Sequence, residues 1–291
     1  MQRRSKFMTK QIKGVTVEEL TIGDEYLFEE ILLRNKEITK QLIETLLGIP
    51  DISDIKYISV EDVHHNTHKN KGIRIDVYIK SQAGVAYIVE LQRKDTKEIE
   101  KRMRYYQAVS DSRQLPTGHP YKDLKDSYVI FICREDIFGK GLYKYSFENT
   151  CLELEGLKLN DGAYKIVFNT QGTKGEVCKS SLAFLNLVEG ISSDDPLVKK
   201  IEAAAEKIKA DEMWREAYMQ SLLRDQDKFD SGFDSGFCSG FDSGVEQGES
   251  RKEIQIAVKM IKRGDSTKEI IEITDLPEQE IEKLKERLTN N

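Results

Sequence analysis

The sequence predicts an α/β protein in which a mixed β-sheet is flanked by helices and followed by a helical C-terminal extension. Three observations predict this class. Short runs of alternating apolar and polar residues, typical of strands, recur between residues 55 and 168. Longer runs with apolar residues at helical spacing precede these strands and lie among them. Beyond residue 190, helical patterns and a glycine-containing repeat follow.

The first predicted element is a helix over residues 24–47, with Leu27 and Ile31 in its apolar stripe. A polar break at residues 34–36 is expected to divide this helix, and the Gly-Ile-Pro segment at residues 48–50 ends it. Two helices in succession are therefore expected before the first strand.

Three strands are predicted next, at residues 55–60, 72–79 and 85–92. The second alternates cleanly between an apolar face and a face that carries Asp76. The short, glycine-containing segment at residues 81–84 joins the second and third strands. These two strands are therefore expected to form an antiparallel hairpin.

A charged amphipathic helix is predicted over residues 96–114, followed by a continuous apolar run at residues 128–133. Such a run is typical of a strand buried on both faces, parallel to its neighbours and central in the sheet. The strand–helix–strand order implies a crossover connection. Two further strands, near residues 143–147 and 164–168, and a helix near residues 180–188 complete this domain.

The C-terminal part of the chain is predicted to be helical, beginning with residues 197–228. A four-residue repeat (DSGF, DSGF, CSGF, DSGV, EQGE) follows at residues 230–249 and allows two alternatives, a flexible linker or a helix with a small-residue stripe. Residues 251–288 suit a DNA-binding helix-turn-helix or a plain packing and oligomerisation unit. The predicted domains are residues 1–190, 191–229, 230–250 and 251–291.

The net charge of −6 and the pI of about 5.5 argue against a protein that simply coats nucleic acid. Local basic patches at residues 3–13 and 93–104 keep nucleic-acid contact open. No apolar run is long enough for a membrane span, and no apolar stretch follows the basic N-terminus. The four cysteines lack metal-binding spacing, so we expect free thiols and a cytoplasmic location.

Asp76 and Glu90 are the residues predicted to carry chemistry, because the hairpin brings them side by side. Two close carboxylates repel each other, so a buried pair is costly unless a cation neutralises it. Mg²⁺ prefers oxygen ligands of this type. Gln92 follows Glu90 by two residues on the same strand face and is expected to orient a metal-bound water.

Such a set of residues suits phosphodiester hydrolysis, in which a metal lowers the pKa of its water and offsets phosphate charge. The DNA-contact candidates lie just downstream and are Arg93, Arg102 and Arg104. The alternative for Asp76, Glu90 and Gln92 is a solvated polar strand face. A further cluster, formed by His64, His65 and His68, lies in a polar stretch that predicts a loop rather than a metal site.

At Asp76, thirteen intervening residues and Glu90-Leu91-Gln92, the chain resembles the PD-(D/E)XK nuclease superfamily, and more narrowly the Rpn family of recombination-promoting nucleases and transposases. Three other segments agree with this resemblance, which covers about residues 20–190. They are Arg104-Tyr105-Tyr106, Gly118-His119-Pro120-Tyr121 before the buried strand, and residues 166–172 (IVFNTQG).

The resemblance implies a restriction-endonuclease-like core, DNA cleavage and dependence on Mg²⁺, with Mn²⁺ or Ca²⁺ as possible substitutes. It also implies an acid from the first helix, for which Glu29 is the candidate, with Asp24 and Glu30 behind it. The third residue of the family motif is usually lysine, and Gln92 stands there instead. Lys94 is the candidate substitute if the strand continues that far.

The predicted function is therefore a metal-dependent DNA endonuclease associated with recombination or mobile elements. The expected metal ligands are Asp76, Glu90 and Glu29, and the expected catalytic residues are Asp76, Glu90, Gln92 and Lys94. Two alternatives stay open, a catalytically weak or inactive DNA-binding or assembly protein that keeps the nuclease fold, and an RNA nuclease. The C-terminal helices are expected to form a homo-oligomer, with no membrane partner.

Overall fold

The computed structural model describes residues 16–63, 73–94 and 96–289. The chain falls into two compact units, Met1–Tyr218 and Met219–Asn291. The basic run at residues 3–13 and the histidines at positions 64, 65 and 68 lie outside the described residues. The predicted subdivision into four domains stays a prediction.

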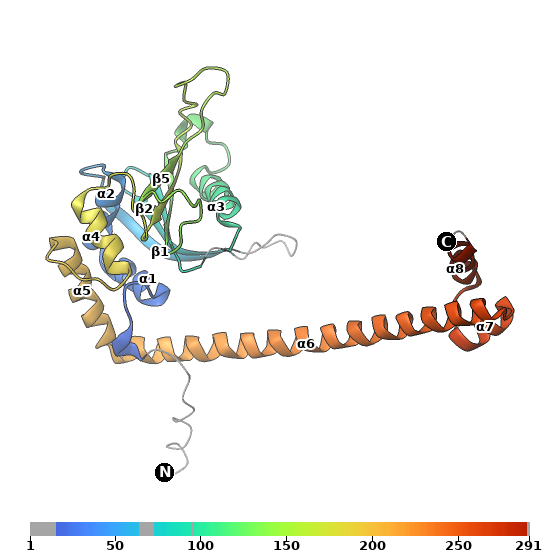
Figure 1. Cartoon of the computed structure of the whole chain (residues 1–291). Coiled ribbons are helices and arrows are strands. Elements are labelled where there is room, and N and C mark those ends of the chain that lie inside the picture. The colour runs from blue at the N-terminus through green and yellow to red at the C-terminus, as the bar shows by residue number, and fades with distance from the viewer. Residues whose placement is uncertain (1–15, 64–72, 95, 290–291) are drawn as a thin grey trace, which may run out of the picture. The chain divides into compact units, whose positions relative to one another are not determined.

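A six-stranded mixed sheet forms the centre of the first unit. Its strands are β1 (Ile55–Val63), β2 (Ile73–Ser81), β3 (Ala86–Gln92), β4 (Ser127–Cys133), β5 (Lys144–Phe147) and β6 (Ala163–Asn169). Their order is β1-β2-β3-β4-β6-β5. Figure 1 labels β1, β2 and β5 within this sheet. The β2–β3 pair is antiparallel, as the predicted hairpin requires, whereas β4 is parallel to both of its neighbours. Strand β4 is therefore central and buried, as its continuous apolar sequence predicts.

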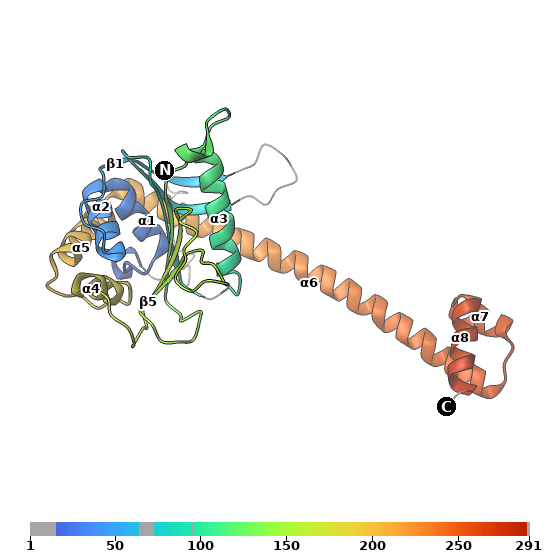
Figure 2. The same cartoon turned by 90° about the horizontal axis from the view of Figure 1, so that it is seen from above.

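Helices cover both faces of the sheet, which confirms the predicted α/β class (Figure 2). One face is covered by α1 (Glu25–Arg34), α2 (Lys36–Leu47) and α4 (Lys179–Val188), with α5 (Pro196–Lys209) packed on these helices. The other face is covered by α3 (Ile99–Gln114), the crossover between β3 and β4. Short 3-10 turns lie at Val17–Glu19 and Tyr121–Asp123.

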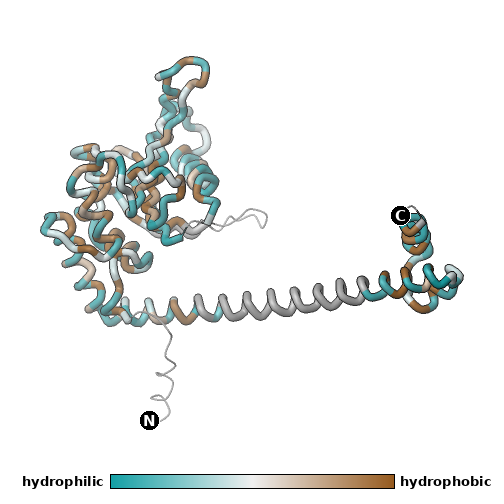
Figure 3. Tube along the Cα trace, in the orientation of Figure 1, coloured by the Kyte–Doolittle hydropathy of each residue, from teal (hydrophilic) through white to brown (hydrophobic). Residues whose placement is uncertain are grey.

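The core under α3 positions the face of the sheet on which the candidate site lies. Met103 and Tyr106 of α3 are buried against Ile88, Phe131 and Val167 of the strands. Figure 3 shows apolar segments gathered where the strands pass between the helices. Because α3 packs through these residues, the side chains at its start are held near the carboxyl end of β3.

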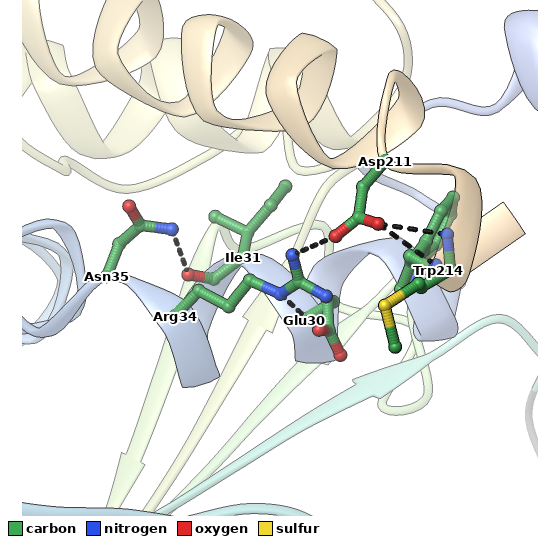
Figure 4. A network of polar contacts seen from close by, with 7 residues as sticks. Glu30, Ile31, Arg34, Asn35, Asp211 and Trp214 are labelled. Atoms are coloured by element: carbon green, nitrogen blue, oxygen red, sulfur yellow. Dashed lines mark hydrogen bonds and ion pairs between the residues drawn. The ribbon is translucent and has the colours of Figure 1, made fainter. Parts of the chain in front are cut away.

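Residues 197–228 are largely helical, as predicted, but they are divided between two helices, α5 and α6 (Glu212–Arg263). Asp211 caps the start of α6, accepting hydrogen bonds from the amides of Met213 at 3.0 Å and Trp214 at 3.3 Å. Arg34 Nη1 also donates to Asp211 at 2.6 Å, which ties α1 to this junction (Figure 4). An aspartate that satisfies two amides begins a new helix here.

The four-residue repeat adopts the helical alternative, because residues 230–249 lie within α6. The second unit packs the end of α6 with α7 (Thr267–Thr274) and α8 (Glu278–Thr289), as the predicted three-helix module requires. Its core contains Ala257, Met260 and Ile270. Among the helices described, none combines the length and apolar character needed to cross a membrane.

Candidate active site

Asp76 and Glu90 face each other where the pairing of β2 and β3 ends. The register pairs Val77 with Val89, so the next pair along the hairpin is Asp76 and Glu90. There the carboxylates replace the backbone carbonyls as hydrogen-bond acceptors. Glu90 Oε1 accepts from the Asp76 amide at 2.9 Å, and Asp76 Oδ2 accepts from the Leu91 amide at 3.2 Å. The structure thus brings the two acids together, and each is fixed by the other strand.

Glu90 is the buried member of this pair, with only 2% of its surface exposed. Burial, followed by the negative charge of Asp76, raises the pKa of Glu90 well above its usual value. The Asp76 amide and Arg102 act in the opposite direction and lower this pKa. The raised pKa means that burial and the neighbouring Asp76 disfavour the charged form of Glu90, and a cation bound beside the pair would favour that form.

Arg102 reaches this acid pair from the first half of α3. Its Nη2 donates to Glu90 Oε2 at 2.9 Å, and its Nη1 donates to Gln92 Oε1 at 2.5 Å. The guanidinium lies over the rings of Phe131 and Tyr106, with 5.3 Å and 5.5 Å from Cζ to the ring centroids. Arg102 therefore turns into the site, whereas the sequence suggested only a DNA contact.

Tyr106 completes the contacts of Arg102, since its hydroxyl accepts from Nη2 at 3.1 Å. Sequence reasoning did not assign this tyrosine to the site. One signal for it was available, because residues four apart on a helix are neighbours. A helix crossing between β3 and β4 also has to cover one face of β3, the face that carries Glu90.

The Gln92 side-chain amide is engaged at both ends. Its oxygen accepts from Arg102, and its nitrogen donates to the carbonyl oxygen of Lys94 at 2.6 Å. Exchanging the oxygen and nitrogen would break both bonds, so these contacts define the orientation of the amide. The role of Gln92 in orienting a metal-bound water stays a prediction.

The condition under which Lys94 was a candidate, that β3 continues to it, is not met, because the strand ends at Gln92 as predicted. The bond from the Gln92 side chain to the Lys94 carbonyl closes a bend directly after the strand. Lys94 therefore does not share the strand face of Glu90, and its side chain is exposed. Its role as the substitute for a motif lysine stays a prediction that strand geometry does not support.

Of the three acids considered in the first helix, Glu29 is the one whose charge reaches Glu90. It is 6% exposed, and its negative charge adds to the raised pKa of Glu90. Asp24 caps α1 by accepting from the Leu27 amide at 3.2 Å. Glu30 instead pairs with Arg34 on the outer side of the helix. The role of Glu29 as a metal ligand stays a prediction.

Arg93 and Arg104, the other DNA-contact candidates, are both exposed. The positive charge of Arg93 acts on Asp24 and Tyr218. Arg104 lines a hollow of about 480 Å³ together with Phe138 and Lys165. Their accessibility suits contact with a polyanion, but both remain candidates for that role.

The donor set of the acid pair suits a hard divalent cation. Asp76 and Glu90 offer only carboxylate oxygens, and such an ion would favour the charged form of Glu90, whose pKa is raised. Within the described parts of the chain, no group of three or more His, Cys, Asp or Glu side chains is arranged to hold a metal. Asp76 and Glu90 would hold the ion, and water would complete its coordination, as is usual for Mg²⁺.

Residues 25–157 match the family model described as PD-(D/E)XK nuclease family transposase. The matched segment contains the helices and strands that carry the acid pair, Gln92 and Arg102. The resemblance inferred from the sequence is thereby confirmed, and the match supports a nuclease-related function. No curated protein and no solved structure matches the chain.

Proposed function

Because residues 25–157 match the model of the PD-(D/E)XK nuclease family transposases, we propose that the protein is a metal-dependent DNA endonuclease. The observation that carries this proposal is the opposed pair Asp76 and Glu90, in which a buried carboxylate with a raised pKa lies beside a second acid. A divalent ion bound there supplies an activated water and offsets charge on the scissile phosphate. Mg²⁺ is the proposed ion, with Mn²⁺ or Ca²⁺ as substitutes.

The side chains have distinct roles in this proposal. Asp76 and Glu90 hold the ion, and the backbone amides of Asp76 and Leu91 keep their carboxylates in place. Glu29 adds negative charge that favours a cation at the same point. Gln92 holds the Arg102 guanidinium beside the acids.

Substrate contact is proposed for the exposed cations around the site. Arg93, Lys94 and Arg104 are accessible to solvent and carry the charge that phosphate oxygens bind. The second unit is proposed to form a homo-oligomer through its helices, because its small core leaves Ile273 of α7 59% exposed. A cytoplasmic location and an association with recombination or mobile elements complete the proposal, the latter supported by the family description.

A catalytically weak or inactive DNA-binding or assembly protein is the second candidate. The observation that favours it is that Arg102 already pairs with Glu90, while the uncharged Gln92 stands at the position where the motif that the sequence resembles usually has lysine. DNA binding that persists without cleavage in any divalent metal would support this candidate.

The test is nicking of supercoiled plasmid in Mg²⁺, Mn²⁺, Ca²⁺ or EDTA. Asp76→Asn is the main variant, since its amide oxygen can still accept from the Leu91 amide. We expect it to lower the cleavage rate on the order of 100-fold or more, the scale for removing a group that stabilises the transition state. Asp194→Asn, at a fully exposed carboxylate, serves as the matched control and should cleave normally.

Equal digestion by the wild-type protein and Asp76→Asn would show that the nuclease comes from a contaminant or from another site. A parallel RNA substrate of the same sequence separates DNA from RNA cleavage. Far-UV circular dichroism on each variant establishes that a lost activity does not reflect a lost fold.

A further inference from the structure

Both oxygens of Glu90 already have a donor. Oε1 accepts from the Asp76 amide, and Oε2 accepts from Arg102 Nη2. Because Glu90 is 2% exposed, water has little access to these oxygens. A divalent ion that binds Glu90 at Oε2 therefore meets the Arg102 guanidinium at the same oxygen.

Of the two donors, Arg102 is the one that can move away from Glu90. The Asp76 amide belongs to the backbone of β2 and moves only with the strand. The Arg102 side chain is 28% exposed and ends a long, flexible stem. If it leaves Glu90, its bond to Gln92 and its position over Phe131 and Tyr106 can still hold it at the edge of the site.

We propose that Arg102 is the resident counter-ion of the acid pair and competes with the divalent ion for Glu90 Oε2, so that it sets the metal affinity of the site. The inference rests on the proposed function, since it assumes that Asp76 and Glu90 bind a metal. Arg102 acts through Glu90 and is therefore a positioning residue. Gln92 anchors the guanidinium in the structure, and in this proposal it still does so after the ion has displaced Arg102 from Glu90.

A purely structural role predicts something different. If Arg102 only clamps α3 onto the sheet, its removal destabilises the fold and leaves metal affinity unchanged or weaker. If it competes with the ion, its removal frees Glu90 and tightens metal binding. The sign of the change in affinity therefore separates the two roles.

The experiment is calorimetric titration of Mn²⁺ into the full chain. Arg102→Gln removes the charge, and Arg102→Lys keeps the charge but not the forked geometry. Arg104→Gln is the matched control, because this exposed arginine lies two residues away on the same helix. We expect Arg102→Gln to bind Mn²⁺ at least about tenfold more tightly than the wild type, equivalent to about 1.4 kcal/mol. Arg102→Lys should stay within about threefold, and Arg104→Gln within about twofold.

Unchanged or weaker Mn²⁺ binding in Arg102→Gln overturns the inference and leaves the proposed nuclease intact, provided that Asp76→Asn abolishes binding. Absence of Asp76-dependent Mn²⁺ binding in every protein overturns both. A measurement on the wild type covers the case in which Arg102→Gln does not fold. The NMR resonance of the Arg102 Nε–H group is identified in the wild type as the one that the Arg102→Lys spectrum lacks. We expect this resonance to change its chemical shift when Mg²⁺ is added to the wild type. An unchanged chemical shift at saturating Mg²⁺ contradicts the competition.

Discussion

Two arginine–glutamate pairs lie at the carboxyl ends of neighbouring strands, and their acids behave in opposite ways. Arg102 contacts Glu90 at 2.9 Å beside β3, and Arg134 contacts Glu189 at 2.8 Å just beyond β4. The pKa of Glu90 is well above its usual value, whereas the pKa of Glu189 is below it. The ion-pair distance therefore does not decide the charge state of the acid.

The difference comes from burial and from a second acid. Glu189 keeps 22% of its side chain exposed and receives two bonds from Arg134, through Nε at 3.1 Å and Nη2 at 2.8 Å. Thr170 Oγ1 adds a third at 2.6 Å. Glu90 is nearly inaccessible and faces Asp76. In the Glu189 pair, the hydrogen bonds from Arg134 and Thr170 stabilise the charged carboxylate. In the Glu90 pair, Arg102 does not offset burial and the charge of Asp76, so a further cation would stabilise the charged form.

The largest difference between the two pairs is expected in the loss of stability when each arginine is replaced. Arg102→Leu leaves a buried acid beside another, so we expect a loss of about 3 kcal/mol in the free energy of unfolding in EDTA at neutral pH. Arg134→Leu removes a partly exposed pair and should cost about 1 kcal/mol. Urea unfolding followed by the fluorescence of Trp214, the single tryptophan and a member of the first unit, measures both. Equal losses would contradict the distinction between the pairs.

The pH dependence of stability should differ in sign between the two acids. Glu90 has a raised pKa, so the folded state holds its proton more tightly, and stability falls as pH rises above about 4.5. Glu189 has a lowered pKa, so its contribution is present above about 4.5 and is lost as pH falls through its folded value.

Two neutral variants test these signs by urea unfolding. The free energy of unfolding of Glu90→Gln, relative to that of the wild type, should increase as the pH rises from about 5 to about 7. Glu189→Gln should be destabilised at about pH 6, by an amount that shrinks below about pH 4. The same sign of pH dependence in both variants would refute the comparison.

A smaller effect than that of Arg102→Leu is expected at Thr170, whose hydroxyl donates to Glu189 and also to the carbonyl oxygen of Cys133. Thr170→Val removes the hydroxyl that donates to Glu189 Oε1, and we expect a loss of about 1 kcal/mol. The pKa of Glu189 should rise toward its ordinary value, because a hydrogen bond that lowers it is gone. NMR titration of the Glu189 carboxyl measures this shift, and a further fall in the pKa would show that Thr170 has another role.

The sequence was sufficient to predict the sheet and the acid pair. Alternation in β2, the short turn at residues 81–84 and the unbroken apolar run of β4 fix strand identity and pairing. A hairpin can bring Asp76 and Glu90 side by side, but the register that pairs Val77 with Val89 comes from the structure. The period of two along a strand places Gln92 on the face of Glu90, and this part of the prediction does not depend on distant parts of the chain.

The orientation of Arg102 could not be predicted from the sequence, because it depends on how α3 packs against the strands. A charged residue on an amphipathic helix is expected to face solvent unless its partner across the interface is known. The start of a new helix at Asp211 was also not predicted. A side-chain hydrogen bond to the backbone, rather than glycine or proline, sets this boundary.

The opposed carboxylates are also part of the sheet, since each accepts a hydrogen bond from the backbone of the other strand. A related protein without cleavage activity would still need acceptors at positions 76 and 90 to hold the end of the hairpin. The presence of both acids in a related sequence therefore reports architecture as much as activity. The side chain of Arg102 makes its described hydrogen bonds only to other side chains, so a change at position 102 reports on the charge balance of the acid pair and not on the hairpin.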